Sequence, residues 1–219
     1  MMGVPWLLAL ELVLYAGSFM CGVITVASVT ITQGHFAGQC ILYGSICFNI
    51  SDQSLTIESS SSPSVCYFVS SISMCVAIYC FSLILYWIYA SVVNDYVSVR
   101  RSVWLSVSLW MCGLLLLFLL MSGCILKIGR DNLCLSVLHN NSSFSSCKDA
   151  QNMTWSNPYI GSEFYVQLYS AEKSVWVSFF FWLLVVAVVV VQRRQALNEE
   201  GQWSCDETEP FLHRRAQVL

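Results

Sequence analysis

Residues 103–126 read VWLSVSLWMCGLLLLFLLMSGCIL, an apolar stretch that contains no charged side chain. A helix that crosses the hydrocarbon core of a bilayer needs about 20 consecutive, mostly apolar residues. The stretch meets this requirement, exceeds the length of an ordinary strand and lacks the period-two alternation of a half-buried strand. It therefore predicts a membrane-spanning helix and an integral membrane protein.

Three further apolar runs flank this stretch, at residues 6–29, 65–93 and 175–191. The 65–93 run has aromatic side chains at both ends, as interfacial belts do, and its length indicates a tilted helix. The predicted fold class is all-α, a four-helix transmembrane bundle. The first run is also compatible with a cleaved signal peptide, because Ala27 and Ser28 are small, but either interpretation places the next loop outside.

The composition agrees with a membrane protein and excludes other classes. Of the 219 residues, 57% are hydrophobic and only 11% are charged. The formal net charge is −3 and no basic cluster extends beyond arginine pairs, so we expect no nucleic-acid partner. The expected partners are the lipid bilayer and, through helix packing, other membrane proteins or a second copy of the chain.

The apolar runs divide the chain into a four-span membrane domain at 1–192 and a tail at 193–219. Outer loops are predicted at 31–64 and 127–174, with a short inner loop at 94–101. The tail alternates basic and acidic residues, which predicts a mostly disordered cytosolic segment.

Sequons for N-glycosylation indicate the side of each loop. They begin at Asn49, Asn140, Asn141 and Asn152, all within the first or third connection. Two intervening spans place these connections on one side, so both loops are predicted outside and both termini in the cytosol. Arginine pairs beside the inner loop and after the last span agree. We therefore expect a multi-pass glycoprotein of the secretory pathway, in the plasma membrane or in endosomal or granule membranes.

The first outer loop mixes β-branched residues with turn formers and is compatible with a short antiparallel β-hairpin. Two strands alone are marginally stable, so a disulfide or a packing surface must support them. Eleven cysteines indicate an oxidising compartment. Cys66 closes this loop at the membrane, and either Cys40 or Cys47 is its predicted disulfide partner.

In the second outer loop, Cys134 and Cys147 bracket a polar segment and are predicted to form a disulfide ring. A disulfide between a cysteine of the first loop and one of the second stays possible. Cys124 lies close enough to the outer surface to be an alternative disulfide partner. A zinc site would recruit His35 or His139, but no cysteine pair has the C-x-x-C spacing of zinc ligands. We expect neither a metal nor another cofactor.

The sequence shows none of the patterns that hydrolytic or transfer chemistry requires. Its three histidines are isolated, and it contains no H-E-x-x-H, G-x-S-x-G or phosphate-binding glycine loop. We therefore expect no enzyme and assign no catalytic residue. Glu11 is the one acid within the predicted spans. It is interpreted either as an interfacial or hydrogen-bonded acid, or as the intramembrane polar site of a small channel or transporter component.

The spans also contain motifs for close helix packing. Ser18 and Gly22 form a small-xxx-small pair, as do Ser73 and Ala77. Such pairs are equally compatible with a compact bundle and with an interface to another protein.

Several short motifs, in order along nearly the whole chain up to the tail, resemble the transmembrane protein 179 family. They are Thr32-Gln33-Gly34, Cys40, Leu42-Tyr43-Gly44, Cys66-Tyr67-Phe68, Tyr86-Trp87-Ile88-Tyr89, Cys124-Ile125-Leu126 and Ala171-Glu172. The resemblance implies a four-pass protein without an assigned activity and carries over no catalytic residue. The chain lacks the Cys-Cys-Gly of tetraspanin loops and the Gly-Leu-Trp of claudins, so no function is borrowed from those groups. The leading hypothesis is a non-enzymatic scaffold or auxiliary subunit of a membrane complex.

Overall fold

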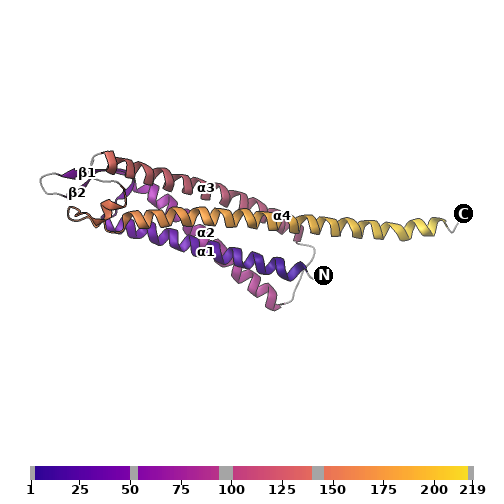
Figure 1. Cartoon of the computed structure of the whole chain (residues 1–219). Coiled ribbons are helices and arrows are strands. Elements are labelled where there is room, and N and C mark those ends of the chain that lie inside the picture. The colour runs from indigo at the N-terminus through magenta and orange to yellow at the C-terminus, as the bar shows by residue number, and fades with distance from the viewer. Residues whose placement is uncertain (1–2, 50–53, 94–100, 140–145, 217–219) are drawn as a thin grey trace.

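Four long helices lie side by side in the computed structural model, with a two-stranded hairpin at one end (Figure 1). The structure describes residues 3–49, 54–93, 101–139 and 146–216. The helices are α1 (Gly3–His35), α2 (Pro63–Val93), α3 (Arg101–His139) and α4 (Phe164–Ala216). Each contains a segment long and apolar enough to cross a membrane. The predicted four-helix transmembrane bundle is confirmed.

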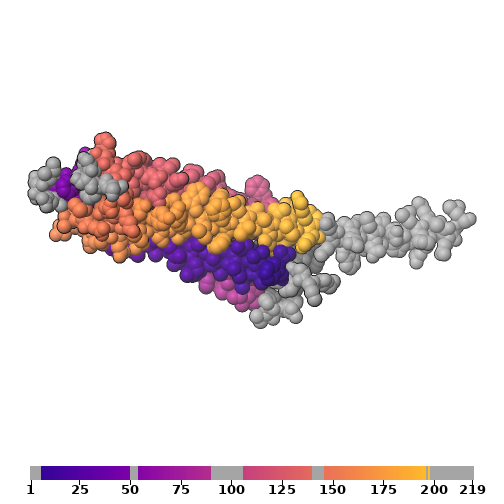
Figure 2. Space-filling model, viewed as in Figure 1, coloured from indigo at the N-terminus to yellow at the C-terminus, as the bar shows by residue number. Residues whose placement is uncertain are grey.

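The core of the bundle follows a heptad spacing, which is clearest on α4. Its buried seam advances by alternating steps of three and four residues, through Leu168, Ala171, Val175, Ser178, Trp182, Val185 and Val189. Such a seam keeps one face of a helix against its neighbours at a shallow crossing angle. The facing seam of α1 is polar: Glu11, Ser18, Thr25 and Thr32 recur every seven residues, and all are buried. Figure 2 shows α1 and α4 next to each other along one face of the molecule.

Small residues bring α1 close to α2. A Cβ atom added to Gly22 would lie 2.9 Å from the carbonyl oxygen of Ser73 and 3.1 Å from the Cβ atom of Ala77. Ser18 and Ser73 are fully buried. Both small-xxx-small pairs therefore pack helices within this chain, which decides between the two interpretations that the sequence left open.

The hairpin consists of β1 (Cys40–Asn49) and β2 (Ser54–Ser61), paired antiparallel from Ile46 opposite Ile57 to Asn49 opposite Ser54. The register shifts between Cys40 and Ser45, where Tyr43 has a positive φ of 60°. A bulge of this kind bends its strand. Leu42, within the bulge, packs against Gly129 of α3. The predicted hairpin is confirmed.

The helices are longer than the predicted spans, mainly at the hairpin end. α1 ends at His35, α3 continues to His139 and α4 begins at Phe164, whereas loops were predicted from 31 and across 127–174. The added turns bury Leu133, Val137 and Phe164 against the rest of the protein. Hydropathy locates the bilayer, but packing beyond the bilayer decides where a helix ends.

α4 also continues at its other end, to Ala216. This differs from the predicted disordered tail at 193–219. Strong helix formers follow the span, among them Gln195, Ala196, Leu197, Glu199 and Glu200. A helix that is already nucleated in the membrane can therefore propagate into the tail.

Candidate functional site

The hairpin and residues 146–163 form one folded unit, which we call the outer cap. After the orientation predicted from the sequence, we call its end of the bundle the outer end, and the end that holds the N-terminus the inner end (Figure 1). The backbone N–H of Leu55 donates to the Thr154 carbonyl, and that of Ser156 donates to the Leu55 carbonyl, both at 3.0 Å. These bonds form a parallel bridge between Leu55 and Trp155. The bridge gives β2 a second backbone partner, which an isolated hairpin lacks.

An aromatic cluster joins the outer cap to the helices. The ring of Phe36, which is fully buried after α1, lies 5.2 Å from Trp155, 6.1 Å from Tyr159 and 6.4 Å from Phe164. Gly161 leaves no room for a Cβ atom beside the Trp155 ring. Edge and stacked contacts of this kind add specific geometry to the area that they bury. The cap is therefore continuous with the outer ends of α1 and α4.

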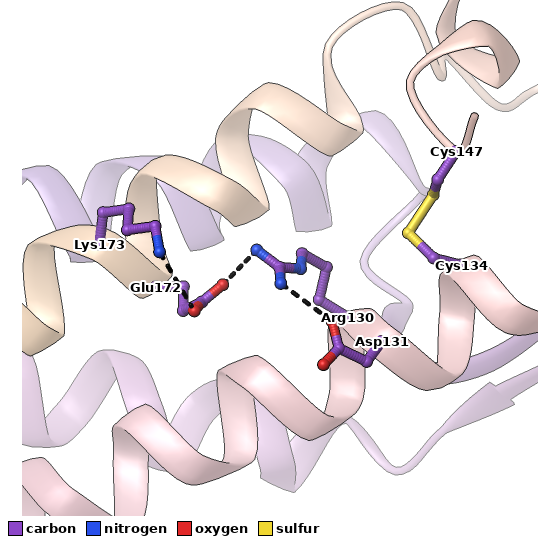
Figure 3. A network of polar contacts seen from close by, with 6 residues as sticks. All are labelled: Arg130, Asp131, Cys134, Cys147, Glu172 and Lys173. Atoms are coloured by element: carbon purple, nitrogen blue, oxygen red, sulfur yellow. Dashed lines mark hydrogen bonds and ion pairs between the residues drawn. A yellow bond between two sulfur atoms is a disulfide. The ribbon is translucent and has the colours of Figure 1, made fainter.

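Two disulfides fix the outer cap covalently. Cys40 at the start of β1 bonds Cys66 in the first turns of α2, with Cα atoms 5.9 Å apart. Cys134 of α3 bonds Cys147 of the cap, with Cα atoms 5.3 Å apart (Figure 3). Of the two partners predicted for Cys66, the structure pairs Cys40. Cys124, which the sequence left as a competitor, is in neither disulfide.

Cys47 is also in neither disulfide, although it lies on β1 within the outer cap. Its Sγ–H donates to Glu58 Oε2 on β2 at 3.0 Å. This hydrogen bond, followed by burial and by the charge of the carboxylate, raises the pKa of the Cys47 thiol.

The sequons that the structure describes also lie on the outer cap. Asn152 is exposed at the end of η2 (Asp149–Asn152), and Asn49 is half-buried at the end of β1. Asn140 and Asn141 lie outside the described residues. The glycosylation of all four asparagines stays a prediction.

A network of charged side chains joins α3 to α4 just below the outer cap, and we call it the outer clasp (Figure 3). Arg130 pairs with Glu172, and the two side chains are only 14% and 4% exposed. Arg130 Nη2 also lies 2.9 Å from Asp131 Oδ1, and Lys173 Nζ lies 3.9 Å from Glu172 Oε1. The Tyr169 ring lies 5.6 Å from the guanidinium of Arg130 and 5.1 Å from the ammonium of Lys173. These additional contacts offset part of the hydration that the buried ion pair loses.

Glu11 belongs to a second polar contact, the inner clasp, which joins α1 to α4. The carboxylate is buried, with 3% of the residue exposed. Its Oε1 accepts a hydrogen bond from Tyr15 Oη at 2.6 Å, and its Oε2 accepts one from Gln192 Nε2 at 3.1 Å. The Tyr15 ring in turn lies 6.0 Å from Trp182, which stacks on Tyr79 of α2 at 5.9 Å. Of the two interpretations of Glu11, this geometry matches the acid that is hydrogen-bonded to a neighbouring helix.

The distance between the two clasps matches the thickness of a membrane. Glu172 and Gln192 are 20 residues apart on one continuous helix. At about 1.5 Å per residue this separation is about 30 Å, the thickness of a typical hydrocarbon core. The clasps therefore lie near the two boundaries of the core, where polar groups are far less costly than at its centre. Sequence reasoning missed Glu172 and Gln192 as partners, although the seven-residue spacing of polar residues on α1 was a visible signal.

His35 and His139 are the histidines that a zinc site would recruit. His35 and His139 end α1 and α3, respectively. Within the described parts of the chain, no three His, Cys, Asp or Glu side chains converge so that they could hold a metal ion.

Four membrane spans with a disulfide-fixed outer cap define the class: this is a multi-pass membrane protein. The family model "Transmembrane protein 179/179B Claudin domain" matches residues 7–212, so the chain belongs to the transmembrane protein 179/179B family. The sequence resemblance is thereby confirmed. The family description classes the domain with claudins, although the chain lacks the Gly-Leu-Trp motif of claudins.

Curated relatives agree with this assignment. The chain is 50% identical to transmembrane protein 179B of Danio rerio, over 97% of this chain and 98% of that protein. It is 40% identical to transmembrane protein 179B of Homo sapiens and 38% identical to that of Mus musculus, each over 81% of this chain and 78% of the relative. No solved structure matches the chain.

Proposed function

We propose that this protein is a non-enzymatic scaffold or auxiliary subunit of a membrane complex, and that the outer cap is the surface that faces the partner. The observation that carries this proposal is the covalent and aromatic fixation of the cap. Two disulfides, one backbone bridge and the Phe36 cluster hold it against the helices. A surface that is ordered before binding loses little conformational entropy when a partner docks, which favours recognition.

The packing within the membrane supports the same proposal. The small residues that commonly mediate contacts between separate membrane proteins, such as Gly22 and Ala77, are used between α1 and α2. The outer cap, by contrast, presents exposed side chains such as Ile160, which is 55% exposed, and Lys148. The cap is therefore the better candidate for contact with a partner.

For the orientation, we propose that the outer cap faces the lumen or the cell exterior and that both termini are cytosolic. Disulfides form and persist in oxidising compartments, and both of them hold the cap. Asn49 ends β1 and Asn152 ends η2, so both lie in the outer cap. In cells we expect peptide N-glycosidase to increase the mobility of the protein, and we expect Asn152→Gln to remove part of that shift. Unmodified Asn49 and Asn152 would contradict the orientation.

The lysines allow a direct test of both proposals. The chain has three, Lys127, Lys148 and Lys173; all lie toward the outer end and all are exposed. A membrane-impermeant, amine-reactive crosslinker applied to intact cells should therefore modify the full-length protein at these positions, as peptide mapping can show. If the lysines are modified only after the cells are permeabilised, the proposed orientation is wrong and the cap faces the cytosol.

The same experiment tests the scaffold. We expect a stoichiometric membrane partner crosslinked through Lys148 of the outer cap, and we expect Lys148→Arg to abolish that crosslink. Lys173→Arg is the matched control, because its position on α4 lies below the cap, and it should leave the crosslink intact. Recovery of the protein alone, as a defined homo-oligomer, would contradict the scaffold proposal.

The runner-up is a small channel or transporter component in which Glu11 is the intramembrane polar site. The burial of Glu11 between two spans, with Tyr15 and Gln192 as neutral hydrogen-bond partners, is the observation in its favour. This alternative expects ion or proton flux in reconstituted vesicles and loss of flux in Glu11→Gln. Absence of flux from well-folded protein would contradict it.

A further inference from the structure

An apolar groove runs between α1 and α2 on the surface that faces the lipid. Its volume is about 580 Å³, and it is lined from Phe19 to Thr30 on α1 and from Met74 to Phe81 on α2. The α1 wall spans about 16 Å of helix at about 1.5 Å per residue. The volume is within the range of sites that hold small molecules, roughly 300–1,000 Å³.

The groove is closed at its inner end and has a shallow floor. The rings of Phe19 and Phe81 lie 5.9 Å apart and bridge the two helices at that end. Ala27 and Ala77 line the groove, and the close contact of Ala77 with Gly22 leaves no deeper space between the helices. A membrane-spanning helix of a partner could not continue along the groove past the two rings, because such a helix extends about 30 Å.

Thr30 is the one polar side chain among the lining residues, and it lies at the outer end of the groove. Two other threonines of α1, Thr25 and Thr32, donate their hydroxyls to carbonyls one turn earlier, at 2.9 and 2.8 Å. The exposed hydroxyl of Thr30 has no hydrogen-bond partner among the described residues. It is therefore available to a ligand in the groove.

The height of Thr30 places this hydroxyl near the outer boundary of the hydrocarbon core. Phe36 contacts Phe164, which aligns the end of α1 with the start of α4. Both depths are counted from that contact at about 1.5 Å per residue. Thr30 lies about 9 Å below the contact on α1, and Glu172 of the outer clasp lies about 12 Å below it on α4. The groove thus begins at the level of the lipid headgroups with a hydroxyl and continues inward between apolar walls.

We propose that this groove binds a membrane sterol, with the sterol hydroxyl at Thr30 and the fused rings against Val23, Val26 and Ala27. A sterol has one hydroxyl at the end of a rigid apolar body. The groove matches this arrangement, because its one polar side chain lies at the outer end and its walls below are apolar. Valine side chains have restricted rotamers and form a stiff wall that suits a rigid ligand. A rigid ring system also loses less conformational freedom on binding than the flexible acyl chain of a phospholipid.

The test uses the full-length protein in phosphatidylcholine nanodiscs and a photoactivatable cholesterol analogue. We expect saturable labelling of peptides that contain residues 19–30 and 74–81, and displacement by unlabelled cholesterol. Ala27→Phe fills the groove and should decrease labelling at least tenfold. The matched control is Ala187→Phe, which places the same side chain on the exposed face of α4 and should leave labelling unchanged. Thr30→Val replaces the hydroxyl with a methyl group of similar size and should weaken affinity about fivefold, the effect of one neutral hydrogen bond.

Three results would overturn the proposal. The first is labelling that does not saturate and is equal in the wild type and Ala27→Phe. The second is labelling of the groove by a photoactivatable phosphatidylcholine that excess cholesterol does not displace, which would assign the groove to an acyl chain. The third is a crosslink from the groove to another protein in native membranes. If Ala27→Phe does not fold, as judged by size-exclusion chromatography, the wild-type competition and Thr30→Val still decide the question.

Discussion

The two ends of this bundle are held together by different kinds of interaction. The outer end combines two disulfides, the Phe36 cluster and the buried Arg130–Glu172 pair. The inner end is joined by the hydrogen bonds of the inner clasp, and α2 diverges there from α1 (Figure 1). The comparison indicates that the outer end is the fixed part of the molecule and that the inner end has more freedom to adjust. The following substitutions test this difference.

Arg130→Met should have the largest effect on stability. The substitution leaves the Glu172 carboxylate buried without its main cation, since Lys173 is more distant at 3.9 Å. Removal of one partner from a buried ion pair typically costs 3–5 kcal/mol, so we expect the free energy of unfolding to fall by about 4 kcal/mol. Denaturant unfolding of the purified protein in mild detergent measures it. Lys173→Met, which removes an exposed and weaker partner, should cost less than about 1 kcal/mol; equal effects of both variants would show that the clasp is not buried.

Loss of the Cys40–Cys66 disulfide should have the next largest effect. The bond closes a loop between residues 26 positions apart. The chain-entropy relation gives about 3.5 kcal/mol for a loop of this size. We expect the double variant Cys40→Ser, Cys66→Ser to unfold at correspondingly lower denaturant concentration. Cys47→Ser is the control, because Cys47 is in neither disulfide. A loss of stability in the control as large as that in the double variant would mean that Cys66 pairs with Cys47, because the double variant removes Cys66 in either case.

The inner clasp should contribute less than either outer contact. In Glu11→Leu the Tyr15 hydroxyl and the Gln192 amide lose their buried acceptor, which should cost about 2 kcal/mol. Glu11→Gln keeps an acceptor for Tyr15 and should cost less than about 1 kcal/mol. The same unfolding measurement compares both variants with Arg130→Met. A larger loss in Glu11→Leu than in Arg130→Met would invert the proposed difference between the two ends.

The difference between local patterns and contacts between distant residues explains which features the sequence could predict. The four spans were recognisable because side chains that face lipid must be apolar, so each span is a run of about 20 mostly apolar residues. The hairpin was recognisable from its β-branched residues and turn formers. The lengths of the helices were not predictable from the spans, because α3 and α4 extend beyond the predicted span limits and pack against the outer cap. The pairing of Arg130 with Glu172 joins residues that are far apart in the chain, so no local pattern contains it. Glu11 was recognised, but its partner Gln192 was taken only as the last residue of the membrane domain.

The smallest predicted effect concerns the thiol of Cys47, and it tests the strand register within the outer cap. The bond to Glu58 raises the pKa of the thiol, so at neutral pH less of it is thiolate than for an ordinary exposed cysteine. Glu58→Gln removes the carboxylate and should lower that pKa, and because only the thiolate is nucleophilic, alkylation by an impermeant maleimide should accelerate a few-fold near neutral pH. At a pH well above both pKa values the two proteins should react equally fast. Ser60→Gln, an exposed position on the same strand, is the matched control. If Glu58→Gln reacts no faster than the wild type at neutral pH, Glu58 does not face Cys47, and the hairpin register of the outer cap is different from the one described.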